Sequence, residues 1–371
     1  MRKNHILMLM LAASLSASAQ SPVKVNQIGY YPDGPKTAVI EPAAKAKSFT
    51  LKDSRGKTVW HGKAVRTSVS PFDGRQRQVV NFSDVRRPGT YTLIAKGKKQ
   101  QVIIAPHAFK DVAAASVKAF YLQRTGMAIE KRYAGEYARP AAHMDQKVIV
   151  HPSAASPLRP AGTVISSPEG WYDAGDYNKY IVNSGFTCGL MLENYLINKA
   201  YYDSMKLDIP ESANSIPDYL DEIMYNLRWM LTMQDPHDGG VYHKLTTPSF
   251  EGFVMPAECR QPRYVVQKGT AAALDFAATM ALAARIYAPY AECAQFCKDA
   301  LKAAGRAYAW AVAHPSVAYQ QDDINKRFKP EIVTGAYGDG HFSDEFFWAA
   351  TELYLSTGEE SYLLQASAMM P

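Results

Sequence analysis

The sequence pattern changes at Pro106-His107, from short β-forming runs to apolar residues at helical spacing, and this change constrains the fold more than any other feature. Residues 23–106 consist of short runs of β-forming residues, separated by turn signals such as Pro88-Gly89. The predicted strands are Val23–Ile28, Thr37–Ile40, Phe49–Lys52, Thr58–His61, Gln78–Phe82, Tyr91–Ile94 and Gln101–Ile104. Short strands at this spacing predict an all-β immunoglobulin-like sandwich.

Beyond Phe109 the apolar residues recur at the spacing of helices. The predicted helices are Phe109–Arg124, Phe186–Tyr202, Ile216–Gln234, Gly269–Tyr287, Glu292–His314 and Ser343–Ser356. We expect no second β region. Helices joined by loops of very different length favour an all-α, α/α toroid over residues 107–371, in which helix pairs surround a core, in preference to a four-helix bundle. The Pro-rich loop Tyr133–Tyr172 is long enough to suggest a functional role.

Residues 1–19 have the pattern of a secretory signal peptide. Arg2-Lys3 is basic, Ile6–Leu15 is a short apolar run, and Ala17-Ser18-Ala19 fits a cleavage site. We therefore expect cleavage after Ala19 and a secreted or periplasmic protein. The apolar run is too short to span a membrane comfortably, and no other segment reaches transmembrane length.

Charge and cysteine content suggest neither a nucleic-acid partner nor a metal site. The formal net charge is +6, and because the Lys and Arg residues are scattered and match no nucleic-acid motif, we interpret them as a solvated surface. The four cysteines are Cys188, Cys259, Cys293 and Cys297. Export would permit disulfides, but the i,i+4 pair Cys293 and Cys297 is typical of packed thiols. No Cys-x-x-Cys pair or His-Cys cluster predicts a set of metal ligands, and we expect no cofactor.

Two carboxylates stand three residues apart in the segment Trp171-Tyr172-Asp173-Ala174-Gly175-Asp176-Tyr177-Asn178-Lys179-Tyr180. Carboxylates serve as general bases and nucleophiles, and the surrounding aromatic faces can stack on sugar rings. This combination is what a glycoside hydrolase needs on one side of the bond it breaks. An isolated Asp-x-x-Asp also suits a turn or a helix cap. A calcium loop fits poorly, because the spacing departs from the EF-hand pattern.

The segment Trp171–Tyr180 resembles the nucleophile-side motif of family 9 glycoside hydrolases, and later segments resemble that family in the same order. They are Ile216–Glu222 continuing to Met233–Asp235, then Gly239–Lys244, and then Asp344–Tyr354. The leading β domain resembles the immunoglobulin-like module found in one branch of the family. The resemblance implies a secreted endoglucanase, an inverting hydrolase of β-1,4-glucans built on an (α/α)6 barrel.

Inversion needs a base that activates water and an acid across the scissile bond, with the two carboxyls about 6.5–9.5 Å apart. By resemblance Asp176 is the base, and Asp173 supports it, so the two titrate as a coupled pair. The family's acid is a Glu far downstream, near an Asn-Glu motif. Six predicted helices are half of the barrel's twelve. We therefore expect an incomplete toroid, an acid beyond Pro371 and little hydrolysis by this segment alone. Glu345 and Glu352 are nearest in position, but both are typical of a packed helix.

The resemblance also implies contacts with a β-glucan polysaccharide or oligosaccharide. The residues assigned to substrate binding are Trp171, Tyr172, Tyr242, His243 and Tyr337. We expect Asn178 and Lys179 to hold the loop instead of touching sugar. Relatives carry structural calcium ions, but no feature of this sequence indicates where such an ion would bind.

Two other functions stay open at this point. One is a non-catalytic glycan-binding remnant, in which the cleft survives without the acid. The other is a polysaccharide lyase on an α/α toroid. A lyase needs cationic groups to neutralise a uronate, and the Asp pair would repel that group. The pattern does not choose among cellulose, mixed-linkage glucan, xyloglucan and glucomannan, or between endo and exo action.

Overall fold

The computed structural model describes residues 21–369, and the signal peptide expected over residues 1–19 lies outside this range. The chain divides into two compact units, with the division after Ala113. The sequence placed this boundary at Pro106-His107, which lies between the last strand of the first unit and the first helix. None of the described helices is long and apolar enough to cross a membrane.

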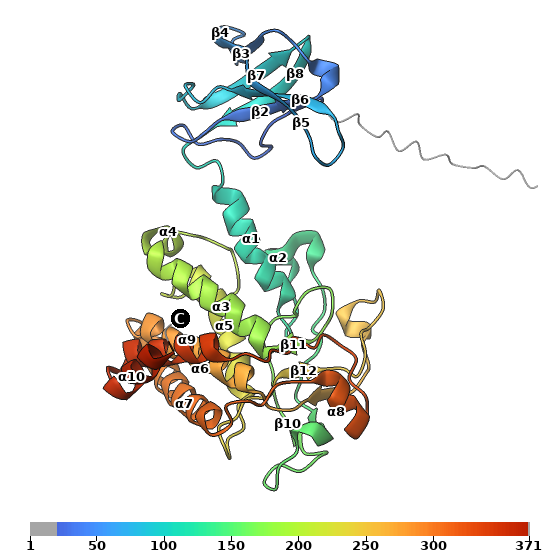
Figure 1. The fold of residues 1–371 in the computed structure, drawn as a ribbon, viewed down its shortest axis with the longest axis vertical. Helices are drawn as coiled ribbons and strands as arrows, with labels where there is room; N and C mark the ends of the chain where they lie inside the picture. Colours follow the sequence, from blue (N-terminus) through green and yellow to red (C-terminus); the bar gives the residue numbers. More distant parts are fainter. Residues whose placement is uncertain (1–20, 370–371) are drawn as a thin grey trace, which may run out of the picture. The chain divides into compact units, whose positions relative to one another are not determined.

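The first unit is a sandwich of two four-stranded antiparallel sheets (Figure 1). One sheet has the order β1-β2-β6-β5 and is made of β1 Val23–Lys24, β2 Thr37–Ile40, β5 Ala64–Val69 and β6 Gln76–Asn81. The other has the order β4-β3-β7-β8 and is made of β3 Phe49–Asp53, β4 Thr58–Gly62, β7 Gly89–Ala95 and β8 Lys98–Ile104. These sheets confirm the predicted β-sandwich.

Alternation builds the core of this sandwich. In β7, Tyr91, Leu93 and Ala95 are buried, while the residues between them face outward. Strand β5 was not predicted. All but one of its residues are exposed, so its sequence shows no alternation of apolar and polar residues.

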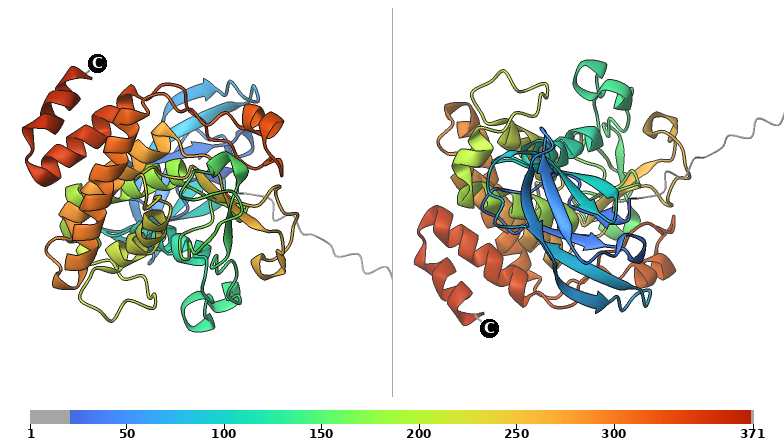
Figure 2. Two further views of the ribbon diagram at one scale, coloured as in Figure 1. Left: turned by 90° about the horizontal axis from the view of Figure 1, so that it is seen from below. Right: turned by 90° about the horizontal axis from the view of Figure 1, so that it is seen from above.

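The second unit is largely helical, as predicted. Its helices are α1 Lys110–Gln123, which starts just before the division, α2 Lys131–Ala134, α3 Ile181–Ile197, α4 Lys199–Asp203, α5 Asp218–Thr232, α6 Thr270–Tyr287, α7 Ala294–Ala313, α8 Gln321–Arg327, α9 Ser343–Thr357 and α10 Glu360–Ala368. Helix α6 is Ala-rich and buried on almost every side, because α3, α7 and α9 pack around it (Figure 2). The small side chains let these neighbours approach closely. The short helices α2, α8 and α10 were not predicted, and the predicted helix Phe186–Tyr202 begins at Ile181 and is divided between α3 and α4.

A small second sheet lies beside these helices, so the prediction of no second β region is wrong. It has the order β10-β9-β13-β12-β11 and is made of β9 Val148–Val150, β10 Val164–Ile165, β11 Lys179–Tyr180, β12 Lys244–Thr246 and β13 Arg263–Val265. Strands of two or three residues are too short to show a periodic pattern, which is why they were missed. The sheet matters for function, because β11 is the end of the segment Trp171–Tyr180, which contains both carboxylates, and leads directly into α3.

Candidate active site

A cavity of about 290 Å³ opens between α1, the loop before β11 and the start of α3. Its lining residues are Ser116, Ala119, Phe120, Gln123, Trp171, Tyr172, Asp173, Tyr180, Asn183, Ser184 and Thr187. The four from α1 recur at helical spacing and therefore share one face of the helix. The sequence-predicted carboxylate Asp173 is part of this wall. Asp176 is not among the lining residues, but it binds Tyr180, which is.

The two carboxylates differ in their hydrogen bonds. Asp173 has a donor on each oxygen: Asn183 Nδ2 lies 2.7 Å from Oδ1, and Tyr337 Oη lies 3.0 Å from Oδ2. In Asp176 both donors meet on Oδ2, with Asn178 Nδ2 at 2.7 Å and Tyr180 Oη at 2.9 Å. Oδ1 of Asp176 thus has no hydrogen-bond partner within residues 21–369 and is open to accept one. Partial burial raises the pKa of Asp173, an effect that its two donors oppose.

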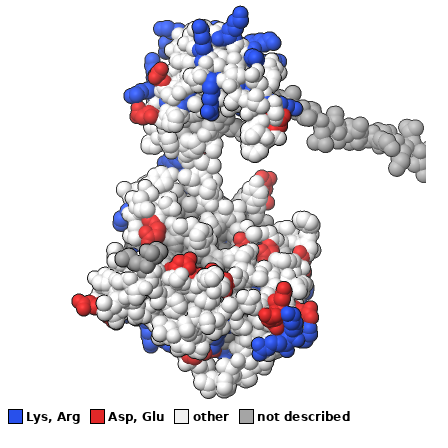
Figure 3. All heavy atoms as spheres, in the orientation of Figure 1, with Lys and Arg blue, Asp and Glu red and all other residues white. Residues whose placement is uncertain are grey.

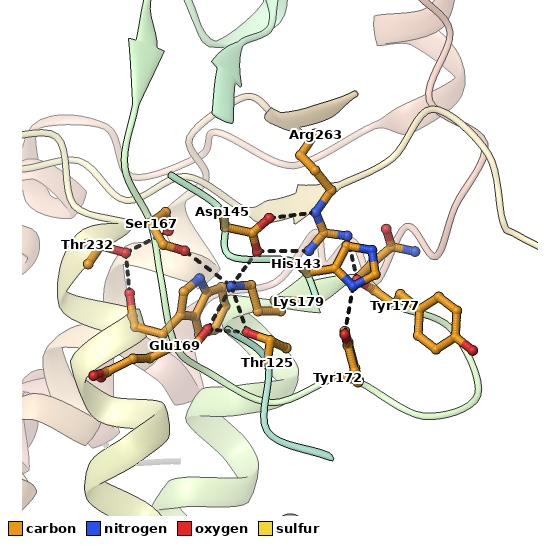
Figure 4. A network of polar contacts seen from close by, with 12 residues as sticks. Thr125, His143, Asp145, Ser167, Glu169, Tyr172, Tyr177, Lys179, Thr232 and Arg263 are labelled. Atoms are coloured by element: carbon orange, nitrogen blue, oxygen red, sulfur yellow. Dashed lines mark hydrogen bonds and ion pairs between the residues drawn. The ribbon is translucent and has the colours of Figure 1, made fainter. Parts of the chain in front are cut away.

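Asp145 is the centre of a buried ion network beneath this loop (Figure 4). Arg263 Nε and Nη2 donate to its carboxylate at 3.0 and 3.1 Å, and Lys179 Nζ lies 2.8 Å from it. Lys179 also donates to the carbonyl oxygens of Ser167 and Glu169. Burial by itself raises the pKa of Asp145, but Arg263 and Lys179 outweigh that effect and hold it at about 2.

Hydrogen bonds from this network and its neighbours hold the Asp-Ala-Gly-Asp turn on both sides. Arg263 Nη1 donates to the carbonyl oxygen of Tyr177 at 2.5 Å, and Lys179 follows the turn directly. On the other side, the Tyr172 hydroxyl and His143 Nδ1 share a hydrogen bond of 2.6 Å. Burial lowers the pKa of Lys179 to about 8. The contacts of Lys179 with Asp145 and with two backbone carbonyl oxygens agree with the expectation that Lys179 holds the loop.

Asn178 also holds the loop. Its side-chain oxygen accepts hydrogen bonds from the Thr247 backbone at 2.9 Å and from Thr246 Oγ1 at 3.1 Å, while its amide group donates to Asp176. One buried side chain therefore connects β12 to the carboxylate. An amide can do this because it carries both acceptor and donor atoms.

The predicted aromatic contacts fall into two groups. Trp171 and Tyr172 line the cavity, although each is almost fully buried. The Trp171 indole donates to Glu222 Oε1 at 2.9 Å, which fixes the plane of the ring. Tyr337 is 47% exposed and stands edge-on to Tyr180, with its hydroxyl on Asp173.

Tyr242 and His243 lie inside the protein, away from the cavity lining. Tyr242 is fully buried, and its hydroxyl contacts Asp235 at 3.1 Å. His243 stacks on Tyr319 at 4.1 Å, and its Nε2 lies 2.7 Å from the carbonyl oxygen of Ala336. The structure therefore does not bring this predicted pair to the groove, and both side chains have structural partners.

Sequence reasoning missed several residues that surround the carboxylates. Tyr180 belongs to the recognised segment and Asn183 to the first turn of α3, so their nearness along the chain was a usable signal. Asp145 and Arg263 are 118 residues apart and gave none. Lys244 is fully buried under the Tyr180 ring and donates to the Gly335 carbonyl oxygen at 2.6 Å. Burial lowers its pKa to about 7.

Glu345 and Glu352 do not line the cavity. Glu352 forms an ion pair with Arg285 at 2.8 Å, as expected of a packed helix. Burial raises the pKa of Glu345 to about 8, and the neighbouring Asp344 adds to this shift. Among residues 21–369, no group of three or more His, Cys, Asp and Glu side chains is arranged to hold a metal ion. All four cysteines are free thiols.

Comparison with known protein families gives two matches. Residues 109–370 match the model of glycosyl hydrolase family 9, and residues 18–100 match the cellulase N-terminal ig-like domain. Among curated proteins, the chain is 51% identical to the xyloglucan-specific endo-beta-1,4-glucanase BoGH9A of Bacteroides ovatus, over 96% of this chain and 61% of that protein. It is 34% identical to endoglucanase D of Acetivibrio thermocellus, over 95% of this chain and 54% of that protein.

Solved structures agree with these matches. A Bacteroides ovatus GH9 structure superposes with a TM-score of 0.92 at 52% identity, covering 94% of this chain and 64% of that one. A metagenome-derived family 9 endoglucanase gives a TM-score of 0.82 at 32% identity, covering 94% and 63%. The chain thus spans less than two thirds of the length of these relatives. With an immunoglobulin-like sandwich followed by a helical region that matches over its whole described length, the chain belongs to glycosyl hydrolase family 9.

Proposed function

We propose that this chain carries the water-activating side of an inverting endo-β-1,4-glucanase, with Asp176 as the general base. The observation that carries the proposal is the free Oδ1 of Asp176. Asn178 and Tyr180 both bind Oδ2, so the carboxylate is held in one orientation while its other oxygen can accept a proton from water.

Asp173 has a different part in this proposal. Each of its oxygens accepts one hydrogen bond, from Asn183 and Tyr337, and keeps a further acceptor site with which Asp173 orients the attacking water. The nearby Asp176 carboxylate adds to the raised pKa of Asp173. The proposed mechanism requires no cofactor, because inversion needs only a carboxylate base and a carboxylic acid.

The substrate class follows from the relatives. The protein that is 51% identical is named as specific for xyloglucan, and another relative is named an endoglucanase. We therefore propose a neutral β-1,4-glucan as substrate, with xyloglucan as the first to test. Neutral sugar suits this cavity, since the half-buried Phe120 in its wall and the exposed Tyr337 beside Asp173 offer aromatic rings that can pack on pyranose rings. Export by the N-terminal segment to the periplasm or the medium is part of the same proposal.

Because little hydrolysis is expected of this segment alone, the test joins it to the C-terminal part of a family 9 relative, in wild-type form and as Asp176→Asn. The amide keeps the hydrogen bonds of the loop but cannot accept the proton of water. We expect xyloglucan binding to be unchanged in affinity electrophoresis and turnover to fall about 10²–10⁴-fold. Asp323→Asn, an exposed residue of α8, is the matched control and should change neither quantity.

Two outcomes would contradict the proposal. Activity of Asp176→Asn within a few-fold of wild type would remove the base from Asp176, and a retained anomer in the first product would exclude inversion. Binding without turnover in the completed wild-type enzyme would support the alternative function, a glycan-binding protein without catalysis.

A further inference from the structure

The modest net charge of the chain hides a strong separation of charge between its two units. Residues 21–113 hold 17 Lys and Arg against six Asp and Glu, a formal charge of +11. Residues 114–371 hold 22 against 29, a formal charge of −7. In Figure 3, Lys and Arg stand out over the β unit. The expectation that the Lys and Arg residues are scattered evenly over the chain is therefore wrong.

Strand register gathers five of these lysines at one end of the β4-β3-β7-β8 sheet. Phe49 pairs with Gly62 and Thr50 pairs with Ile94, so the start of β3, the end of β4 and the β7–β8 turn lie side by side. The lysines that these three places carry are Lys47, Lys63, Lys96, Lys98 and Lys99, which we call the lysine end. Because adjacent strands are about 4.8 Å apart, the lysine end extends about 14 Å across the sheet.

The lysine end has no internal neutralising partner. All five side chains are exposed, and within residues 21–369 none of them forms an ion pair. Three arginines of the unit, Arg75, Arg77 and Arg86, do form ion pairs. Arg77, for example, binds both Asp73 and Glu41. Like charges crowded together repel one another, and an external polyanion would remove that cost.

The side chains around the lysine end argue against two classes of partner, a lipid bilayer and a neutral sugar. Binding to a bilayer normally adds apolar side chains that enter the lipid. The most exposed aromatic side chain of the unit, Phe72, follows β5 in the chain, whereas Lys63 precedes it, so the two lie at opposite ends of that strand. The only Trp of the unit, Trp60, packs inward against Phe82 and cannot stack on a neutral sugar.

We propose that the lysine end binds an acidic polysaccharide, a polymer with a carboxylate on successive sugars. Repeated carboxylates match a row of lysines by charge and need neither a pocket nor an aromatic platform. The choice of a polysaccharide rests on the proposed function, because a neutral β-glucan that occurs together with an acidic glycan would then lie within reach of the helical unit. The β unit would hold the enzyme near its β-glucan substrate while itself binding only the acidic polysaccharide.

The experiment measures the affinity of residues 21–371 for polygalacturonate by affinity electrophoresis. In one variant the five lysines of the lysine end become glutamine. In the control, five exposed lysines of the helical unit become glutamine: Lys131, Lys147, Lys298, Lys302 and Lys329. We expect the first variant to bind at least about tenfold more weakly, and the control to bind like wild type. Binding should also weaken as salt rises past about 0.15 M, where the Debye length is about 8 Å.

Xyloglucan and lipid vesicles complete the test. The lysine variant should bind xyloglucan as wild type does, and Asp176→Asn should bind polygalacturonate as wild type does, so failure of either proposal can be told from failure of the other. Equal loss in the lysine variant and in the control would overturn the inference. So would lysine-dependent binding to vesicles of phosphatidylglycerol and phosphatidylcholine without binding to polygalacturonate.

Discussion

Replacing Asp145 by asparagine should destabilise the helical unit strongly. The carboxylate lies between Lys179 and Arg263, at 2.8 and 3.0 Å, and all three side chains are buried. Asparagine keeps the shape but leaves two buried cations facing each other without a counter-charge. Removing one member of a buried ion pair typically costs about 3–5 kcal/mol. That is a large part of the total free energy of unfolding of a domain, which is about 5–15 kcal/mol.

The loss should depend on pH in a defined way. In the wild-type chain the pKa of Asp145 is about 2, below its unfolded value, so its contribution is complete above about pH 4 and is lost as pH falls toward 2. The pKa of Lys179 is about 8, below its unfolded value, and Asp145 keeps it from falling further. In the variant Lys179 should therefore release its proton at lower pH, which relieves the repulsion. The deficit should be greatest between about pH 4 and 6 and smaller from about pH 8 upward.

Urea unfolding followed by Trp fluorescence, at pH 5 and at pH 9, measures this deficit. The matched control is Asp323→Asn, because Asp323 contacts Lys326 at 2.7 Å on the surface of α8 and should show no measurable change at either pH. A deficit below about 1 kcal/mol at pH 5 would show that the network does not behave as a buried ion cluster. An equal deficit at both pH values would refute the part assigned to Lys179.

Two further predictions concern single groups near the site. Tyr337→Phe removes the hydroxyl that donates to Asp173, so the pKa of Asp173 should rise above its already raised value; a ¹³C NMR titration measures this, and an unchanged value would contradict it. Tyr137→Phe, at an exposed position, should leave that titration unchanged. Gly170→Ala should cost about 2–4 kcal/mol in urea unfolding, because Gly170 has φ +89° and the added Cβ would lie 2.7 Å from the Trp229 ring. Gly358→Ala also has a positive φ but nothing within 4 Å, so its cost should be only about 1–2 kcal/mol; equal costs would deny the clash.

Local patterns predicted the parts of this protein that local forces determine. Alternation and turns gave the β-sandwich, and apolar spacing gave the long helices α3, α5, α6, α7 and α9. The chemistry of the Asp-Ala-Gly-Asp segment was also visible, since two carboxylates close together need no long-range information. Asn178 and Lys179 hold the loop as expected, because a buried amide and a buried ammonium in such a segment need many partners.

Long-range partners could not be predicted in the same way. The Asp145–Arg263 pair joins residues 118 positions apart, and no pattern near either one announces the other. Tyr242 and His243 were expected to touch substrate because they follow a Gly-Gly turn. Their burial depends on Asp235 and Tyr319, which come from elsewhere in the chain. Polar side chains next to a turn do not reveal whether they face solvent or the interior.

The buried lysines near the carboxylates indicate that this region favours a fixed backbone over maximal stability. Burial lowers the pKa of Lys179 to about 8 and of Lys244 to about 7, so each loses stability by being charged inside the protein. Apolar residues of similar size would often be as stable. What an apolar residue cannot do is donate to the carbonyl oxygens of Ser167, Glu169 and Gly335, as these lysines do. Those bonds fix the backbone beneath and behind the Asp-Ala-Gly-Asp turn. We infer that the region gives up stability to hold its two carboxylates in place.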